Sequence, residues 1–196
     1  MKLQDNLPQG VTVDGKFYKL DFDFRNVLRM MDVLGSKDLM PAAKAYNAVR
    51  CLTKRPKNVF KVLSAVQQLL FDQRPQKDAQ KVTDFVQDAG LIRAAFLQVY
   101  GINLYRDKLH WIEFKELLNA IPEGSRYAEV VGIRSRPLPA PTKYNNAERQ
   151  WLMKAKADVA LEMTEEEREK KYSDDAARVF GGLLSMINKG SGNNGE

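Results

Sequence analysis

Apolar residues recur at helical spacing through much of the chain, most clearly in two runs between positions 84 and 121. Each run places its apolar residues three or four positions apart, on one face of a helix. Gly101 follows the first run, where helices often end in a left-handed residue, and Pro122 follows the second. We therefore predict two antiparallel helices, joined by residues 101–108, that bury their apolar faces together. The apolar positions are Phe85, Ala89, Ile92, Phe96 and Val99, then Trp111, Phe114, Leu117, Leu118 and Ile121.

Residues 11–20 carry the pattern of a β-hairpin. The pair Asp14–Gly15 supplies the positive φ angles of a two-residue type I′ turn. A lone hairpin is marginally stable in water, so this one must pack on helices or pair with another chain. Because an open strand edge can accept a further strand, the hairpin is a candidate partner-binding element. The register pairs Val13 with Lys16 and Val11 with Tyr18, and Val11, Val13 and Tyr18 are its candidate binding residues.

Three helices are predicted after the hairpin. Asp23 can cap the first, which begins at Phe24 and ends near Gly35. The second covers residues 39–52 and the third opens at Pro56. We expect Met30 and Met31 to fill the core. The apolar stripe of the first helix consists of Phe24, Val27, Leu28, Met31 and Leu34. Residues 72–82 are polar and predict a linker to the central pair.

The remaining chain predicts shorter elements. Residues 125–133 form a short helix, and the proline-rich residues 136–141 force an extended chain. Asn145 and Glu148 resemble a capping box that opens a helix to about residue 162. A charged stretch then leads to a last amphipathic helix, which either docks on the core or binds a partner. Its apolar face consists of Phe180, Leu183, Leu184 and Ile187.

These elements predict a mainly α fold, in which an N-terminal β-hairpin precedes a bundle of about six to eight helices and an extended Pro-rich segment precedes the C-terminal helices. Four parts follow from the pattern. Residues 1–71 combine the hairpin with basic helices, and residues 83–162 form the central helical core. Residues 163–188 provide a charged tether with the amphipathic helix, and residues 189–196 a disordered tail.

The composition argues against catalysis. The 196 residues include one cysteine and one histidine, so neither an internal disulfide nor a zinc site of Cys and His ligands is available within the chain. His110 begins the second central helix, where a capping or packing role is expected. We predict no catalytic residue, no metal and no cofactor. No apolar run approaches the ~18 residues that a membrane span needs, and the first ten residues lack the apolar region of a signal peptide.

The net charge of +6 is concentrated in one region. Residues 37–61 hold seven basic residues against Asp38 alone, so the rest of the chain is neutral overall. Such a patch is either a solvated surface or a site that attracts phosphates or an acidic protein. A second cluster before the prolines has the same two interpretations. The candidate residues are Lys54, Arg55, Lys57 and Lys61 in the first region, and Arg134 and Arg136 in the second.

Four segments together resemble the bacteriophage gene-product-fifteen (Gp15) family, which is found in tail gene clusters of siphophages and prophages. They are YKLDFDFRNVLRM, DFVQDAGLIRAAFLQVYGINL, KLHWIEFKELLNAIPEGSRY and VGIRSR, in this order and spacing. The resemblance implies a non-enzymatic tail assembly chaperone that keeps the tape measure protein soluble during tail assembly. It further implies the tape measure protein as partner, with the tail-tube protein and a second copy of the chain as further candidates. The location implied is the host bacterial cytoplasm, with the chain absent from the mature virion.

Two alternatives remain open at this point. In the first alternative, the chain is a structural tail or connector component of the virion. In the second, it is a basic nucleic-acid-binding phage protein. The second alternative lacks support in the sequence, because no interleaved aromatic platform and no helix-turn-helix spacing is evident. We expect no membrane association.

Overall fold

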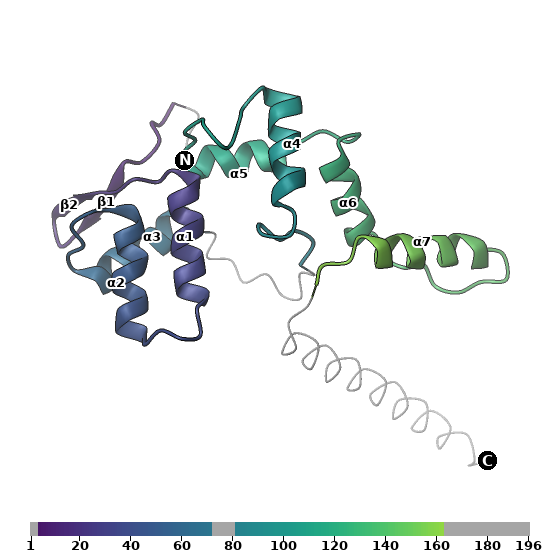
Figure 1. Ribbon diagram of the computed structural model, residues 1–196, viewed down its shortest axis with the longest axis horizontal. Helices are drawn as coiled ribbons and strands as arrows, with labels where there is room; N and C mark the ends of the chain where they lie inside the picture. The colour runs from purple at the N-terminus through teal and green to yellow at the C-terminus, as the bar shows by residue number, and fades with distance from the viewer. Residues whose placement is uncertain (1–3, 72–80, 163–196) are drawn as a thin grey trace, which may run out of the picture. The chain divides into compact units, whose positions relative to one another are not determined.

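The computed structural model describes residues 4–71 and 81–162, which are mainly helical with a two-stranded hairpin at the N-terminal end (Figure 1). This confirms the predicted fold class. The chain divides into two compact units, Met1–Pro137 and Leu138–Glu196, each considered by itself. The elements are β1 (Gly10–Val13), β2 (Lys16–Lys19), α1 (Phe24–Gly35), α2 (Pro41–Leu52), α3 (Val59–Leu70), α4 (Ala89–Tyr100), α5 (Trp111–Asn119), α6 (Arg126–Ser135) and α7 (Asn146–Asp158).

The hairpin has the predicted register. Val11 lies opposite Tyr18 and Val13 opposite Lys16, and the turn residues Asp14 and Gly15 have φ angles of 49° and 73°. The apolar residues of β1 belong to the main core, and β1 packs on α3. The hairpin thus gains its stability from helices of the same chain, as its marginal intrinsic stability requires.

Local sequence signals predict where α1 and α2 begin, but not where α3 begins. The Asp23 carboxylate accepts a hydrogen bond from the Arg25 backbone N–H at 3.0 Å and caps α1, as predicted. Helix α2 carries Pro41 in its first turn. Helix α3 begins at Val59 rather than at the predicted Pro56. The reason is Asn58, whose left-handed φ of 46° lies outside the α-helical region and keeps the helix from starting earlier.

The central helices meet through aromatic side chains. The ring of Phe114 on α5 lies 5.2 Å from Phe96 of α4 and 4.8 Å from Phe24 of α1. Helix α4 crosses α5 in Figure 1, whereas the sequence predicted an antiparallel pair. Helix α4 also starts only at Ala89, after a turn over residues 85–88, and ends at Gly101 with a φ of 69°.

One core serves most of the first unit. Its buried cluster extends from Val11 to Tyr127, so the hairpin and helices α1 to α3 share it with α4 and α5. The indole Nε1 of buried Trp111 has no hydrogen-bond partner in the described part of the chain. None of the described helices is both long enough and apolar enough to span a membrane.

The last described helices differ from the prediction in one cap and in their ends, because α6 reaches Ser135 rather than residue 133 and α7 ends at Asp158 rather than near residue 162. Ser125 caps α6 by accepting a hydrogen bond from the Ala128 backbone N–H at 3.1 Å. Asn145, by contrast, forms no capping box, because its side chain is used in the turn before α7. It accepts from the Thr142 backbone N–H and donates to the Ala140 carbonyl, both at 2.9 Å. The predictions for residues 163–188 and 189–196 lie outside the described residues.

Candidate functional site

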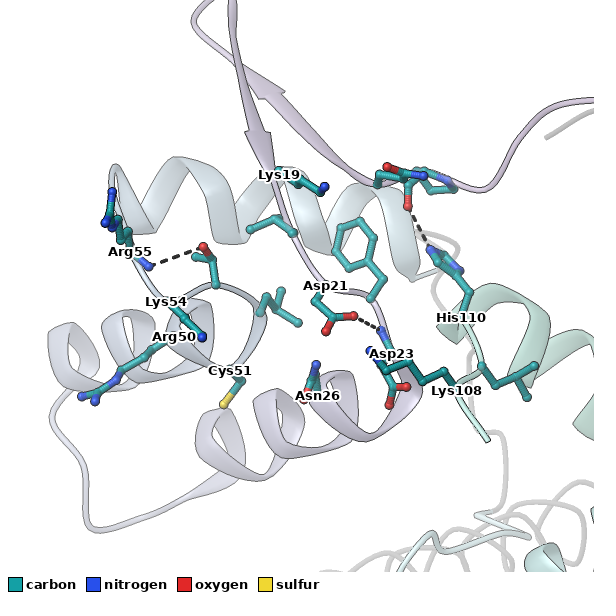
Figure 2. Close-up of a pocket in the computed structure, with 17 residues that line it drawn as sticks. Lys19, Asp21, Asp23, Asn26, Arg50, Cys51, Lys54, Arg55, Lys108 and His110 are labelled. Carbon is teal, nitrogen blue, oxygen red and sulfur yellow. Dashed lines mark hydrogen bonds between the residues drawn. The ribbon is translucent and has the colours of Figure 1, made fainter. Parts of the chain in front are cut away.

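A cleft of about 930 Å³ lies where three segments of the first unit converge (Figure 2). The first segment is the passage from β2 to α1, residues 19–23 with Asn26. The second is the end of α2 and the following loop, residues 50–55. The third is the strand-like stretch 108–110 before α5, and Pro8 with Gln9 completes the lining. The first and second segments are about 30 positions apart in the sequence, and the second and third about 60, yet together they line one cleft.

Backbone hydrogen bonds fix the three segments to one another. The Asp21 N–H donates to the Leu52 carbonyl at 2.9 Å, which ties the β2–α1 passage to the end of α2. The Phe24 N–H donates to the Leu109 carbonyl at 2.9 Å, and the Trp111 N–H donates to the Phe22 carbonyl at 2.8 Å. Backbone hydrogen bonds therefore fix the relative positions of the segments that line the cleft, in addition to the packing of their side chains.

His110 has a structural role at the edge of this cleft, as the sequence predicted. Its Nδ1 accepts a hydrogen bond from the Ile112 N–H at 3.1 Å and caps α5. Its Nε2 is therefore the protonated nitrogen, and it donates to the Pro8 carbonyl at 3.0 Å. Both ring nitrogens are used, so His110 is not available as a general base.

Asp23 is held as a carboxylate by Arg25. Burial alone would raise the pKa of Asp23, but the hydrogen bonds from the Arg25 side chain and backbone, together with the guanidinium charge, lower it below its usual value. The guanidinium reaches Asp23 at 2.8 and 2.9 Å, and it also donates to the carbonyls of Tyr105 and Asp107. This acid therefore holds α1 and the 105–107 loop in place.

Two further observations concern Cys51 and metal binding in the described residues. Burial raises the pKa of the Cys51 thiol, and its Sγ donates to the Asn47 carbonyl, so the thiolate needed for nucleophilic chemistry is disfavoured. Within residues 4–71 and 81–162, no three side chains of His, Cys, Asp and Glu gather where they could hold a metal ion.

The rim of the cleft is basic. Five cationic residues line it against two acids, and one of these acids, Asp23, is already paired with Arg25. None of the five forms a salt bridge with a carboxylate of the described chain. All five are exposed, and the rim thus offers positive charge to a ligand. They are Lys19, Arg50, Lys54, Arg55 and Lys108.

The predicted basic patch is only partly brought together. Lys54 and Arg55 lie on the rim, and Lys57 is exposed in the loop after it. Lys61 forms a salt bridge with Asp14 in the hairpin turn at 2.7 Å. That pair is exposed and contributes little stability.

Arg134 does not belong to an exposed basic cluster, which corrects the sequence interpretation. It is only 9% exposed, and its guanidinium forms a bidentate salt bridge with buried Asp88 at 2.7 and 2.9 Å. It also donates to the Val82 carbonyl at 3.1 Å. Arg136 remains exposed after the end of α6. The two arginines therefore have different environments and form no common anchor.

The hairpin residues proposed as a partner-binding edge are also used within the chain. Val11 and Val13 are 6% and 8% exposed in the core, so these side chains are not available to a partner. Tyr18 is half-buried, and its hydroxyl accepts a hydrogen bond from the Asn58 side chain at 2.7 Å. The other predicted binding residues, Phe180, Leu183, Leu184 and Ile187, lie outside the described residues.

A second hollow, of about 480 Å³, lies beside α1 and α3. We call it the apolar groove. Met30, Met31 and Leu34 of α1 line it, together with Gln67 of α3 and Phe71. Met30 is fully buried, as predicted for a core residue, whereas Met31 and Leu34 are partly exposed. Helical spacing along α1 was the signal for this groove, but only the packing shows which side of the stripe stays uncovered.

Comparison with known proteins identifies one family. The family model described as Bacteriophage Gp15 protein matches residues 3–161, which is most of the chain. No curated protein and no solved structure matches.

Proposed function

The chain belongs to the bacteriophage Gp15 protein family, and on that premise we propose that it is a tail assembly chaperone for the tape measure protein. In this proposal the chain catalyses no reaction. It acts in the host bacterial cytoplasm during assembly of a siphophage tail and is absent from the finished virion. The tail-tube protein and a second copy of the chain are further candidate partners.

The observation that carries this proposal is the apolar groove. A tape measure protein, as implied for the partner, is a long amphipathic helix whose apolar stripe must be covered until the tail tube surrounds it. Met31, Leu34 and Phe71 border the groove and are partly exposed, so they can contact such a stripe. Methionine side chains are flexible and polarisable, and they adapt to partners of varied sequence.

The binding mode that fits this groove is a helix laid along α1. Apolar residues three or four positions apart on the partner would contact the side of α1 that carries Met31 and Leu34. Because the contact is apolar, its strength should change little with salt. Reversible binding is expected, since only a small part of the partner's surface enters a hollow of about 480 Å³.

The test is co-expression of the tagged chain with segments of the tape measure protein from the same phage, followed by pull-down. We expect recovery with the wild-type chain and at least about tenfold less with Leu34→Glu, because burying a charge in the groove is costly. Leu97→Glu is the matched control, since Leu97 is 53% exposed on α4, away from the groove. Met31→Lys serves as a second groove variant if Leu34→Glu fails to fold. Equal recovery with the groove and control variants would refute the groove as the binding site.

Mass spectrometry of purified virions distinguishes the alternative roles. A chaperone is absent from virions, or present far below one copy per tail, while it co-purifies with the tape measure protein from infected cells. Stoichiometric presence in virions would instead establish a structural tail or connector component. A nucleic-acid binder would show an affinity for phage DNA or RNA that falls steeply with salt, because phosphate contacts release counterions.

A further inference from the structure

From the cleft described above we infer a second binding site, separate from the apolar groove, for an extended acidic segment of a partner protein that also carries an apolar side chain. The inference does not rest on the chaperone proposal, because it follows from the charge and shape of the cleft alone. Among the residues that the structure describes, the cleft and the groove share only helix α1, and none lines both.

Charge is the first argument. The five rim cations come from three segments of the chain, so interaction with one helix end does not explain all of them. Arg50, Lys54 and Arg55 do complement the negative C-terminal end of α2. Lys19 at the end of β2 and Lys108 before α5 have no such reason to face the same space. Cations gathered at one concave surface raise the local concentration of an anionic ligand.

The floor of the cleft is the second argument. Buried apolar side chains form it, and all four are at most 6% exposed. A single apolar side chain of the ligand would contact this floor while carboxylates flank it at the rim. The floor residues are Leu20, Phe22, Leu52 and Leu109.

Asp21 favours a polypeptide over a nucleic acid. Its carboxylate lies inside the cleft, with Oδ1 accepting the Asp23 N–H at 3.1 Å (Figure 2). A phosphodiester chain presents acceptors and negative charge along its whole length, so Asp21 would repel it. A peptide carries backbone N–H groups, one of which can donate to the remaining Asp21 oxygen. Among the described residues that line the cleft, none is an exposed aromatic that could stack on a base.

The experiment measures binding of a fluorescein-labelled twelve-residue peptide that alternates glutamate and leucine, by anisotropy with the full chain. Two further probes are a peptide with lysine in place of glutamate and a single-stranded oligonucleotide of equal net charge. The main variant is Lys54→Glu with Arg55→Glu. The matched control is Arg136→Glu with Lys143→Glu, which reverses two exposed charges outside the cleft and gives the same net charge.

We expect the glutamate peptide to bind the wild-type chain and the control variant equally, to lose about tenfold in affinity with the cleft variant, and to bind more tightly than either other probe. Lys19→Glu with Lys108→Glu alters the other two segments and replaces the main variant if that variant fails to fold. Absence of peptide binding, equal losses with cleft and control variants, or tighter binding of the oligonucleotide would each overturn the inference. The tape measure pull-down stays unaffected by the cleft variant, so the two proposals fail separately.

Discussion

Charged side chains have opposite environments in two regions of the molecule. One is the seam, where residues 81–88 meet α6, and the other is the cleft beside α2. In the seam, Arg134 and Asp88 are buried and fully paired. In the cleft, Lys54 and Arg55 are exposed and have no carboxylate partner among the described residues. Burial decides the difference: a buried charge must be neutralised by a fixed partner, whereas an exposed one remains free to meet a ligand. The comparison separates the charges that hold the fold from those that can bind.

The seam should respond most strongly to substitution. Arg134→Met removes the guanidinium but keeps much of its length, and it leaves the Asp88 carboxylate buried without its counter-charge. We expect a loss of about 3–5 kcal/mol in the free energy of unfolding, measured by urea titration. Arg136→Met is the control and should stay within about 0.5 kcal/mol of wild type.

A second substitution sharpens this result. Adding Asp88→Asn to Arg134→Met removes the stranded charge, so part of the lost stability should return. If Arg134→Met costs less than about 1 kcal/mol, the seam is not a buried structural pair and the comparison fails.

An intermediate effect is expected at Asp23, which lies at the boundary of the cleft and caps α1. Asp23→Ala removes both the cap and the pairing with Arg25, and we expect it to cost about 1–2 kcal/mol. Its pKa is lower in the folded than in the unfolded chain, so the folded chain binds fewer protons. The stabilisation is therefore complete above the unfolded value of about 4 and disappears as the pH falls through the lower folded pKa.

The pH dependence of the free energy of unfolding tests whether the pKa of Asp23 is lowered in the folded chain, which a measurement at one pH does not. Urea titrations between pH 7 and pH 2 should show the wild-type chain losing more stability at acid pH than Asp23→Ala does. Parallel curves for the two chains would mean that Asp23 titrates normally in the folded state. Asp38→Ala is the control, because Asp38 is exposed, lies away from Asp23 and Arg25, and forms no salt bridge in the described part of the chain.

The smallest effect belongs to the rim. Lys54→Gln with Arg55→Gln should change the free energy of unfolding by no more than about 0.5 kcal/mol, because both side chains are exposed. Thermal denaturation followed by circular dichroism measures it. A large destabilisation would show that Lys54 and Arg55 stabilise the folded chain, which would contradict their assignment to ligand binding.

Local features of the fold could be predicted from the sequence, whereas contacts between distant segments could not. The Asp14–Gly15 turn, the Asp23 cap and the Gly101 terminus each depend on a few neighbouring residues, and the structure confirms all three. The capping box at Asn145 failed because the same side chain can bond to the preceding turn. Helical spacing also extended α4 to Phe85, although the chain turns there before Ala89.

The candidate sites show the same limit. Arg134 and Asp88 are 46 positions apart, so nothing near Arg134 in the sequence reveals its burial or distinguishes it from the exposed Arg136. Val11 and Val13 were predicted to bind a partner, because nothing in the hairpin sequence indicates that α3 packs against β1. The cleft combines residues 19–23, 50–55 and 108–110, which no local pattern links. Clustering of charge within residues 37–61 was the only sequence signal that pointed toward it.

Hydrogen–deuterium exchange of the chain, alone and with a tape measure segment bound, tests the central claim most directly. We predict slower exchange on binding in the second half of α1 around Met31 and Leu34 and at the end of α3 near Phe71, with α6 unchanged. Protection confined to other elements, or no change at saturating concentrations of the segment, would contradict the account.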